Sequence, residues 1–149
     1  MAGQSLSEFL RQQKDQQQES NMSAAEVRAE WVEAVRNLVE LVQAWLRLER
    51  ADGLLDLAVT QAQVDEERLG SYEVPVLEIT AAGKVVTMQP VARIIIGGLG
   101  RVDLVCGPKR RLLVRNAEKL WFVSSREPRD KGQELNEGTF KETMKLLLS

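Results

Sequence analysis

The chain contains no histidine and only one cysteine, Cys106, among its 149 residues. Without an imidazole there is no histidine base, no histidine metal ligand and no Ser-His or Cys-His pair, so the mechanisms that depend on them are excluded. A single cysteine can form neither an internal disulfide nor a cysteine-rich metal site, which is typical of a reducing compartment. We therefore predict a cytoplasmic protein that is not an enzyme, with no catalytic residue, no metal site and no cofactor.

Long hydrophobic runs are absent as well. The most apolar stretch, residues 91–99, is interrupted by Arg93 and two glycines, and it is far shorter than the roughly 20 residues of a membrane-spanning helix. The cluster of Leu6, Phe9 and Leu10 is too short for the core of a signal peptide, so we expect no membrane segment. The chain does have 44% hydrophobic residues, which is enough apolar surface for most of it to fold as one domain.

Residues 1–22 form a polar arm that carries six glutamines. Ser5 and Glu8 have the spacing of a capping box, in which each side chain satisfies a free backbone donor of the other residue. The sequence therefore predicts a marginal helix that either frays or lies against a partner. The arm's candidate interface consists of its three apolar residues, Leu6, Phe9 and Leu10.

A long helix is predicted over residues 23–52. Ser23 and Glu26 repeat the capping-box spacing at its start, and Gly53 is expected to end it. Its buried stripe advances by alternating steps of four and three residues. The members of this stripe are Trp31, Val35, Leu38, Val42 and Trp45.

Further apolar residues flank both edges of that stripe, so the apolar arc is wider than a surface helix needs. Either the whole arc faces the protein's own core, or one edge packs on a second copy of the chain. One edge contains Ala34, Leu41 and Leu48. We assign the possible partner interface to the opposite edge, which contains Val32, Val39 and Leu46.

From Leu54 the apolar period changes to two, which predicts about six antiparallel strands over residues 54–125, with separate strands at 91–96 and 101–106. A turn at Ala82 and Gly83 places Leu77 and Ile79 on one face with Val86 and Met88. A turn at Ala117 and Glu118 places Leu112 and Val114 beside Trp121 and Val123. A last helix over 137–148 would bury Phe140, Met144 and Leu147, so the fold class is α+β with a curved antiparallel sheet around the long helix.

Two groups of residues are candidate binding sites for small anions or metal ions. Gly97, Gly98 and Gly100 suggest a phosphate-binding loop, but the residues after them alternate like a strand, so a structural bend is the better interpretation. Asp65, Glu66 and Glu67 are predicted to form a solvated acidic loop. Cys106 is expected to be a small buried residue.

The C-terminal third is basic, since residues 107–149 contain 10 basic and 6 acidic side chains while residues 1–106 contain 10 and 16. Such a patch could dock on an acidic protein surface or attract nucleic acid. The overall pI near 5.4 argues against nucleic acid. The candidate patch, within the hairpin region 109–131, consists of Lys109, Arg110, Arg111, Arg115, Arg126 and Arg129.

The function that the sequence favours is a non-catalytic protein–protein interaction or regulatory module that forms a homo-oligomer. One alternative is a small-ligand pocket between helix and sheet, into which Tyr72, Arg93 and Asp103 would point. The other alternative is nucleic-acid binding by the basic hairpin. The simpler expectation for Asp103 is a surface ion pair with a basic residue such as Arg93 or Arg111.

Overall fold

The computed structural model describes residues 5–21, 23–124 and 132–149, and of residues 14–21 it describes the backbone alone. The helices are α1 (Leu6–Asn21), α2 (Ala24–Trp45), α3 (Arg47–Ala51) and α4 (Glu137–Leu148). The strands are β1 (Leu55–Glu66), β2 (Gly70–Ala81), β3 (Lys84–Ala92), β4 (Arg101–Cys106), β5 (Lys109–Arg115), β6 (Trp121–Ser124) and β7 (Gln133–Glu134).

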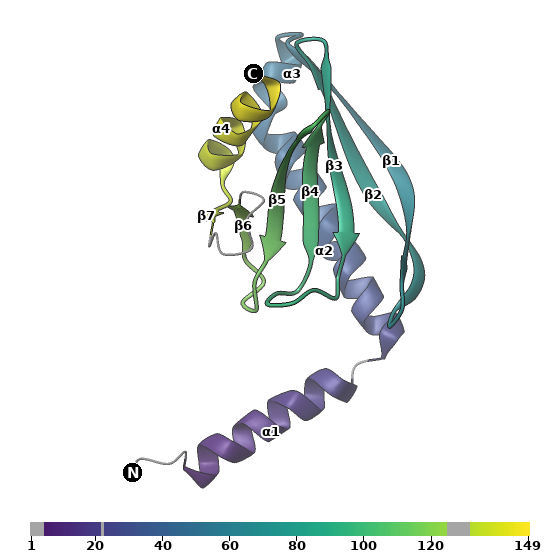
Figure 1. Cartoon of the computed structure of the whole chain (residues 1–149), viewed down its shortest axis with the longest axis vertical. Coiled ribbons are helices and arrows are strands. Elements are labelled where there is room, and N and C mark those ends of the chain that lie inside the picture. Colours follow the sequence, from purple (N-terminus) through teal and green to yellow (C-terminus); the bar gives the residue numbers. More distant parts are fainter. Residues whose placement is uncertain (1–4, 22, 125–131) are drawn as a thin grey trace.

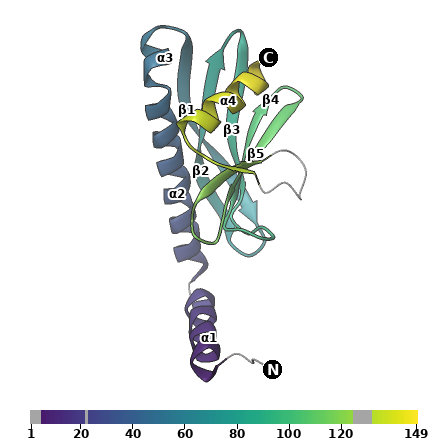
Figure 2. The same cartoon turned by 90° about the vertical axis from the view of Figure 1, so that its left-hand side faces the viewer.

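The strands form one antiparallel sheet in which each strand pairs with the next along the chain, from β1 to β7. The long helix α2 runs along one face of this sheet, and α4 packs on the same side where α2 ends (Figures 1 and 2). The α+β class, the long helix and the antiparallel sheet are therefore confirmed. The described sheet has one short strand, β7, beyond the six expected.

The predicted helix boundaries agree with the structure, with one interruption. The Ser23 side chain accepts a hydrogen bond from the backbone N–H of Glu26 at 3.1 Å, which starts α2. The helix is broken at Leu46 and resumes as α3, and Gly53 follows with a φ of +71°. At α4, Asn136 is the capping residue and forms a reciprocal capping box with Thr139.

The core lies between the sheet and the two helices. Trp31, Val35, Leu38 and Val42 are buried, as their helical spacing predicts. Trp45 is half-buried against the Phe140 ring, with ring centroids 5.8 Å apart. The remaining core residues of α4, Met144 and Leu147, are also buried as predicted.

The hairpin between β2 and β3 has the predicted register, with Leu77 opposite Met88 and Ile79 opposite Val86. The alternation does not hold along the whole of β2. Tyr72 and Val74 are buried at one end of the strand and Leu77 and Ile79 at the other, although these two pairs have opposite parity. All residues from Val74 to Leu77 are buried, so a different face of this long, twisted strand is buried at each end.

The second predicted hairpin is wrong in register. Residues 116–120 form a five-residue connection, so Leu113 lies opposite Val123 and Arg115 opposite Trp121. Leu112 and Val114 therefore occupy the other face of the sheet, because a one-residue change in loop parity exchanges the faces. The separate strand predicted at 91–96 is also wrong, since β3 ends at Ala92 and β4 begins at Arg101.

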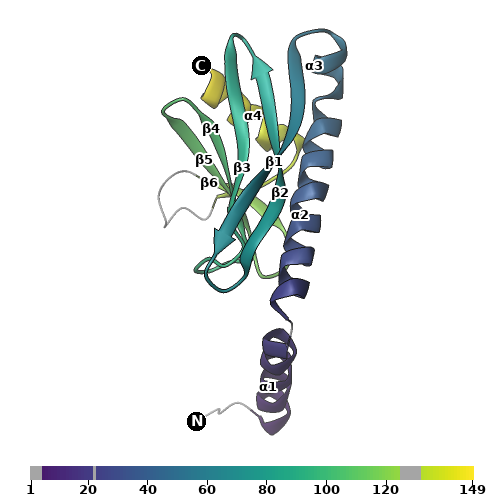
Figure 3. The ribbon, with the colours of Figure 1, turned by 90° about the vertical axis from the view of Figure 1, so that its right-hand side faces the viewer.

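Helix α1 lies beyond the start of α2, apart from the sheet (Figures 1 and 3). The capping box at its start is present, because Ser5 and Glu8 each bond the other's backbone N–H through their side chains. Its apolar residues Leu6, Phe9 and Leu10 are exposed. The predicted arm is thus a helix that buries none of these three side chains in the body of the chain.

Candidate interaction surfaces

The loop of residues 93–100, between β3 and β4, is held by one carboxylate. Glu66, at the end of β1, accepts hydrogen bonds from the backbone N–H groups of Arg93 at 3.1 Å and Ile94 at 3.0 Å. It also accepts a hydrogen bond from the hydroxyl of Tyr72. Burial of Tyr72 and the adjacent carboxylate raise the pKa of its phenol. The expected solvated acidic loop is therefore wrong for Glu66, which fixes a neighbouring loop.

The glycines of this loop serve close packing. The backbone N–H of Leu99 donates to the carbonyl of Arg115 at 2.7 Å, and the Arg115 N–H donates to Gly100 at 3.0 Å. Gly100 has a φ of +141°, and a Cβ there would lie 2.1 Å from the buried Trp31 ring. The prediction of a structural bend is confirmed, because the strand β4 follows these glycines directly.

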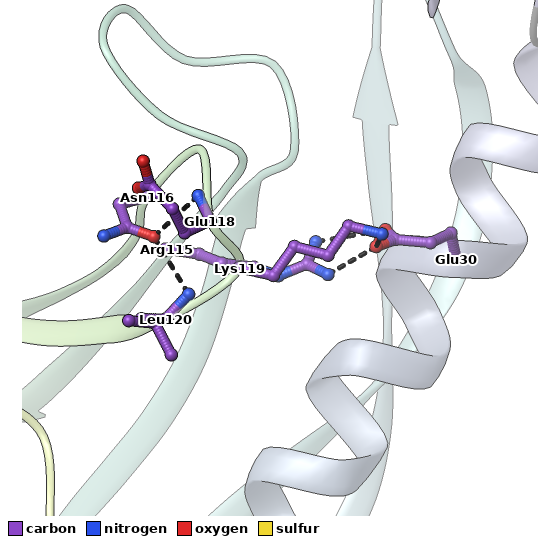
Figure 4. Close-up of polar contacts among 6 residues, drawn as sticks. All are labelled: Glu30, Arg115, Asn116, Glu118, Lys119 and Leu120. Atoms are coloured by element: carbon purple, nitrogen blue, oxygen red, sulfur yellow. Dashed lines mark hydrogen bonds and ion pairs between the residues drawn. The ribbon is translucent and has the colours of Figure 1, made fainter.

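An ion pair joins the end of β5, just before the loop of residues 116–120, to α2 (Figure 4). Arg115, on β5, donates two hydrogen bonds from its guanidinium to the carboxylate of Glu30, one of them at 3.0 Å. The Arg115 side chain is 5% exposed and that of Glu30 is 28% exposed. The hydrogen bond from Arg115 lowers the pKa of Glu30, although partial burial acts in the opposite direction.

Two further contacts order the same loop of residues 116–120 (Figure 4). The Asn116 side-chain oxygen accepts hydrogen bonds from the backbone N–H groups of Glu118 at 3.0 Å and Leu120 at 2.9 Å. The Lys119 ammonium lies 3.5 Å from the Glu30 carboxylate. Both loops at this end of the sheet are therefore tied down by polar contacts.

These two loops expose large apolar side chains. Ile96 is fully exposed, and Ile94 and Leu120 are 40% and 49% exposed. The loops adjoin each other, since Leu99 and Arg115 are hydrogen-bonded. We call Ile94, Ile96 and Leu120 the end surface. It is on the end of the body where α2 begins, which is also the end that carries α1 (Figures 1 and 3).

The long helix exposes the edge of its apolar arc opposite to the predicted one. Val39 and Leu46 are only 4% and 3% exposed, and Val32 packs against the same core, so these residues do not form an open interface. The reason is that the sheet and α4 cover a wider arc of α2 than the central stripe. On the other edge Leu41 and Leu48 are 47% and 64% exposed.

Leu41 and Leu48 belong to a stripe on the outer side of the helix, where Asn37 and Ala44 are also exposed. The stripe advances by four, three and four residues, which is the spacing of one helix face. Two exposed charges of opposite sign, Glu40 and Arg47, flank it one heptad apart. We call Asn37, Leu41, Ala44 and Leu48 the outer stripe.

The predicted ligand pocket is not assembled. Tyr72 and Arg93 do come together, through Glu66. Asp103 lies instead on the opposite face of the sheet from the core residue Leu104, where it accepts hydrogen bonds from Arg101 at 2.7 and 2.9 Å. These bonds raise the pKa of Arg101.

The expectation that Asp103 forms a surface ion pair is also wrong. Its side chain is buried rather than on the surface, and its second cation is Arg110, at 3.4 Å, rather than Arg93 or Arg111. Strand pairing explains this, because Arg101 and Arg110 lie on the same face of the sheet as Asp103. The Asp103 carboxylate is therefore paired with arginines of its own strand and of the adjacent strand.

The predicted basic patch is dispersed, as far as the described residues include it. Arg115 is buried toward α2, and Arg110 pairs with Asp103 on the other face. Lys109 donates to the carbonyls of Leu146 and Ser149 at the end of α4. Arg111 is half-buried and bonds the backbone of its neighbour. Arg126 and Arg129 lie outside the described residues.

No cluster of three or more cysteine, aspartate or glutamate side chains among the residues that the structure describes could hold a metal ion. Cys106 is buried and unbridged, as predicted. No helix in the described ranges is long and apolar enough to span a membrane.

Comparisons of the chain with protein-family models, with curated proteins and with solved structures returned no match. The functional argument therefore depends on the surfaces of this molecule. Sequence reasoning named the apolar residues of α1 but missed the end surface and the outer stripe. The signal for the outer stripe was present in the spacing of Leu41, Ala44 and Leu48, with Glu40 and Arg47 one heptad apart beside them.

Proposed function

We propose that this chain is a non-catalytic protein–protein interaction module that self-associates along the outer stripe, which continues from α2 into α3. The observation that carries the proposal is the exposed row of Leu41 and Leu48 with two charges of opposite sign, Glu40 and Arg47, along one side of it. Such a surface is self-complementary, because a two-fold axis presents the same patch of each copy to the other.

The geometry favours an antiparallel pair. A two-fold axis between Leu41 and Ala44 would place Leu41 of each copy against Ala44 of the other, and Asn37 against Leu48. The same operation brings Glu40 of each copy within reach of Arg47 of the other. Charges that flank an apolar helix face in this way select partner and orientation. In a parallel pair, Glu40 and Arg47 of one copy would lie on the opposite side of the interface from Glu40 and Arg47 of the other, so the two charges would not be paired.

Packing at the centre of such a pair is possible because Ala44 is small. Ala44, Arg47 and Ala51 line a shallow hollow on the outer side of the helix, which can accept a leucine side chain of the second copy. The stripe is only about three turns long. We therefore expect an interface at the small end of the usual range and a dimer in rapid exchange with monomer.

Sedimentation velocity over a wide range of protein concentration tests the proposal. Glu40→Arg and Arg47→Glu should each weaken dimerisation about ten-fold, because each places like charges across the two-fold axis. The double charge swap should restore dimerisation, because it re-creates the opposite-charge pair. Glu73→Arg, on an exposed position of β2, is the matched control and should leave association unchanged.

Both charged positions are exposed, so these substitutions are not expected to unfold the chain, and circular dichroism checks this. A wild type that stays monomeric throughout would overturn the proposal. So would a double swap that associates no better than the single variants, because the charge pairing would then play no part.

A further inference from the structure

The end surface and the first turns of the otherwise polar helix α1 both expose apolar side chains, and both are located at the end of the body where α2 begins. We infer that the end surface of one copy receives the first turns of α1 from a second copy. The contact is reciprocal, so two copies that meet end to end each donate a helix and each accept one. This contact is separate from the outer stripe and does not depend on it.

The first argument is the rigidity of the end surface. Ile94 and Ile96 lie on a loop whose backbone is fixed by Glu66 and by Arg115, and Leu120 lies on a loop fixed by Asn116. A loop that is free to rearrange could turn its isoleucines inward. Because this loop is tied down, its apolar side chains stay in water until a partner covers them.

The second argument is the match of area. On α1, Phe9 and Leu10 follow Leu6 by three and four residues, so both adjoin it on one face, and all three are exposed. Three large apolar side chains on each side expose roughly 300–400 Å² of surface. Two reciprocal contacts would bury roughly 1,400 Å² in total, which is within the range of specific interfaces, about 1,200–2,000 Å².

The third argument is charge. Glu8 lies next to Phe9 on α1, and Lys119 lies next to Leu120 on the end surface, where its side chain is 61% exposed although its ammonium is 3.5 Å from Glu30. Opposite charges beside the two apolar clusters favour their pairing over the pairing of two identical surfaces. Residues 5–21 contain two basic and three acidic side chains, and this balance disfavours an anionic lipid surface, which selects helices with a basic polar face.

The experiment uses the full chain carrying Glu40→Arg, so that any pairing through the outer stripe is weakened and association reports the end contact. Phe9→Gln and Ile96→Ser are each added to this background, and self-association is measured by sedimentation equilibrium. Each substitution should weaken association at least ten-fold, because each removes an apolar residue from both reciprocal contacts. Leu54→Ser, on an exposed leucine at the opposite end, is the matched control and should have no effect.

Mixing the Phe9→Gln and Ile96→Ser proteins gives the decisive result. The intact α1 of one variant can bind the intact end surface of the other, so the mixture should associate more strongly than either protein alone. A mixture that associates no better than its components would overturn the inference. Binding of the protein to vesicles of phosphatidylcholine and phosphatidylglycerol, lost with Phe9→Gln and Ile96→Ser and without self-association, would overturn it in favour of a lipid surface.

The two proposals fail in distinguishable ways. If the outer stripe does not pair, Glu40→Arg leaves association unchanged while Phe9→Gln and Ile96→Ser still reduce it. If the end contact does not form, Phe9→Gln and Ile96→Ser leave association unchanged while Glu40→Arg still reduces it. If both form, wild-type protein should associate beyond the dimer as its concentration rises, and either class of substitution should limit it to dimers.

Discussion

Replacing Glu30 by glutamine is expected to lower the free energy of unfolding by about 2 kcal/mol at pH 7. The guanidinium of Arg115 is almost fully buried, and Glu30 is the partner that accepts both of its hydrogen bonds. Removing one partner of a buried ion pair costs about 3–5 kcal/mol, because the other charge is left uncompensated. The Glu30 side chain is 28% exposed, so water reaches the pair and the expected loss is smaller.

The pH dependence follows from the lowered pKa of Glu30. An unfolded glutamate titrates near 4.5 and the folded one below that value. The stabilisation by this carboxylate is therefore fully present above the unfolded pKa, and it is lost as the pH falls through the folded pKa. The difference in stability between wild type and Glu30→Gln should be constant at neutral pH and should shrink below about pH 4.5.

Urea denaturation followed by tryptophan fluorescence measures both effects, and thermal unfolding should show a decrease in Tm of roughly 4–8 °C at pH 7. Glu33→Gln is the matched control, since Glu33 is on the same helix and pairs with Arg36 at 2.8 Å with both side chains more than half exposed. It should cost less than about 0.5 kcal/mol. Equal losses for the two variants at pH 7, or a Glu30→Gln deficit that persists unchanged at pH 3, would refute the reasoning.

Two further predictions concern the loop between β3 and β4. Gly100→Ala should lower the free energy of unfolding by at least about 3 kcal/mol or prevent folding, because its Cβ would overlap the buried Trp31 ring. Gly97→Ala has open space around its Cβ and should cost only about 1 kcal/mol. Similar urea midpoints for the two variants would contradict this prediction. Glu66→Ala should raise amide hydrogen exchange in the loop at least ten-fold by removing the acceptor of two backbone N–H groups, while Glu67→Ala should not, and unchanged exchange in both variants would show that the carboxylate does not hold the loop.

Two hairpins show where sequence reasoning succeeds and where it stops. Between β2 and β3, Ala82 and Gly83 specify a two-residue turn, and Gly83 adopts the positive φ that such a turn needs. The register of the hairpin follows from that turn, and the apolar residues beside it give the face that is buried near the turn. Between β5 and β6, the side chain of Asn116 closes a five-residue loop by hydrogen bonds, and this odd loop length exchanged the predicted faces.

Which residues form the interaction surfaces depends on packing between elements that are distant in the sequence. Leu41 and Val39 are both apolar residues beside the same stripe, and their spacing gives no reason to prefer one edge. Packing of α2 on the sheet and of α4 over its end decides that Val39 is buried and Leu41 is open. In the same way, Ile96 resembles a core residue in sequence, and its exposure follows from the contacts that Glu66 and Arg115 make with its loop.

The sequence by itself determined the elements of this protein. Its helix and strands follow from local properties, because each depends on neighbours within a few positions. These properties are the 3.6-residue period of α2, the two-residue period of the strands and the capping residues Ser23 and Asn136. The composition alone excluded histidine chemistry. The tertiary structure alone decided which apolar edge remains open, which charges are paired and which loop is held outward. These outcomes depend on contacts between residues as distant as Glu30 and Arg115, which no local period records.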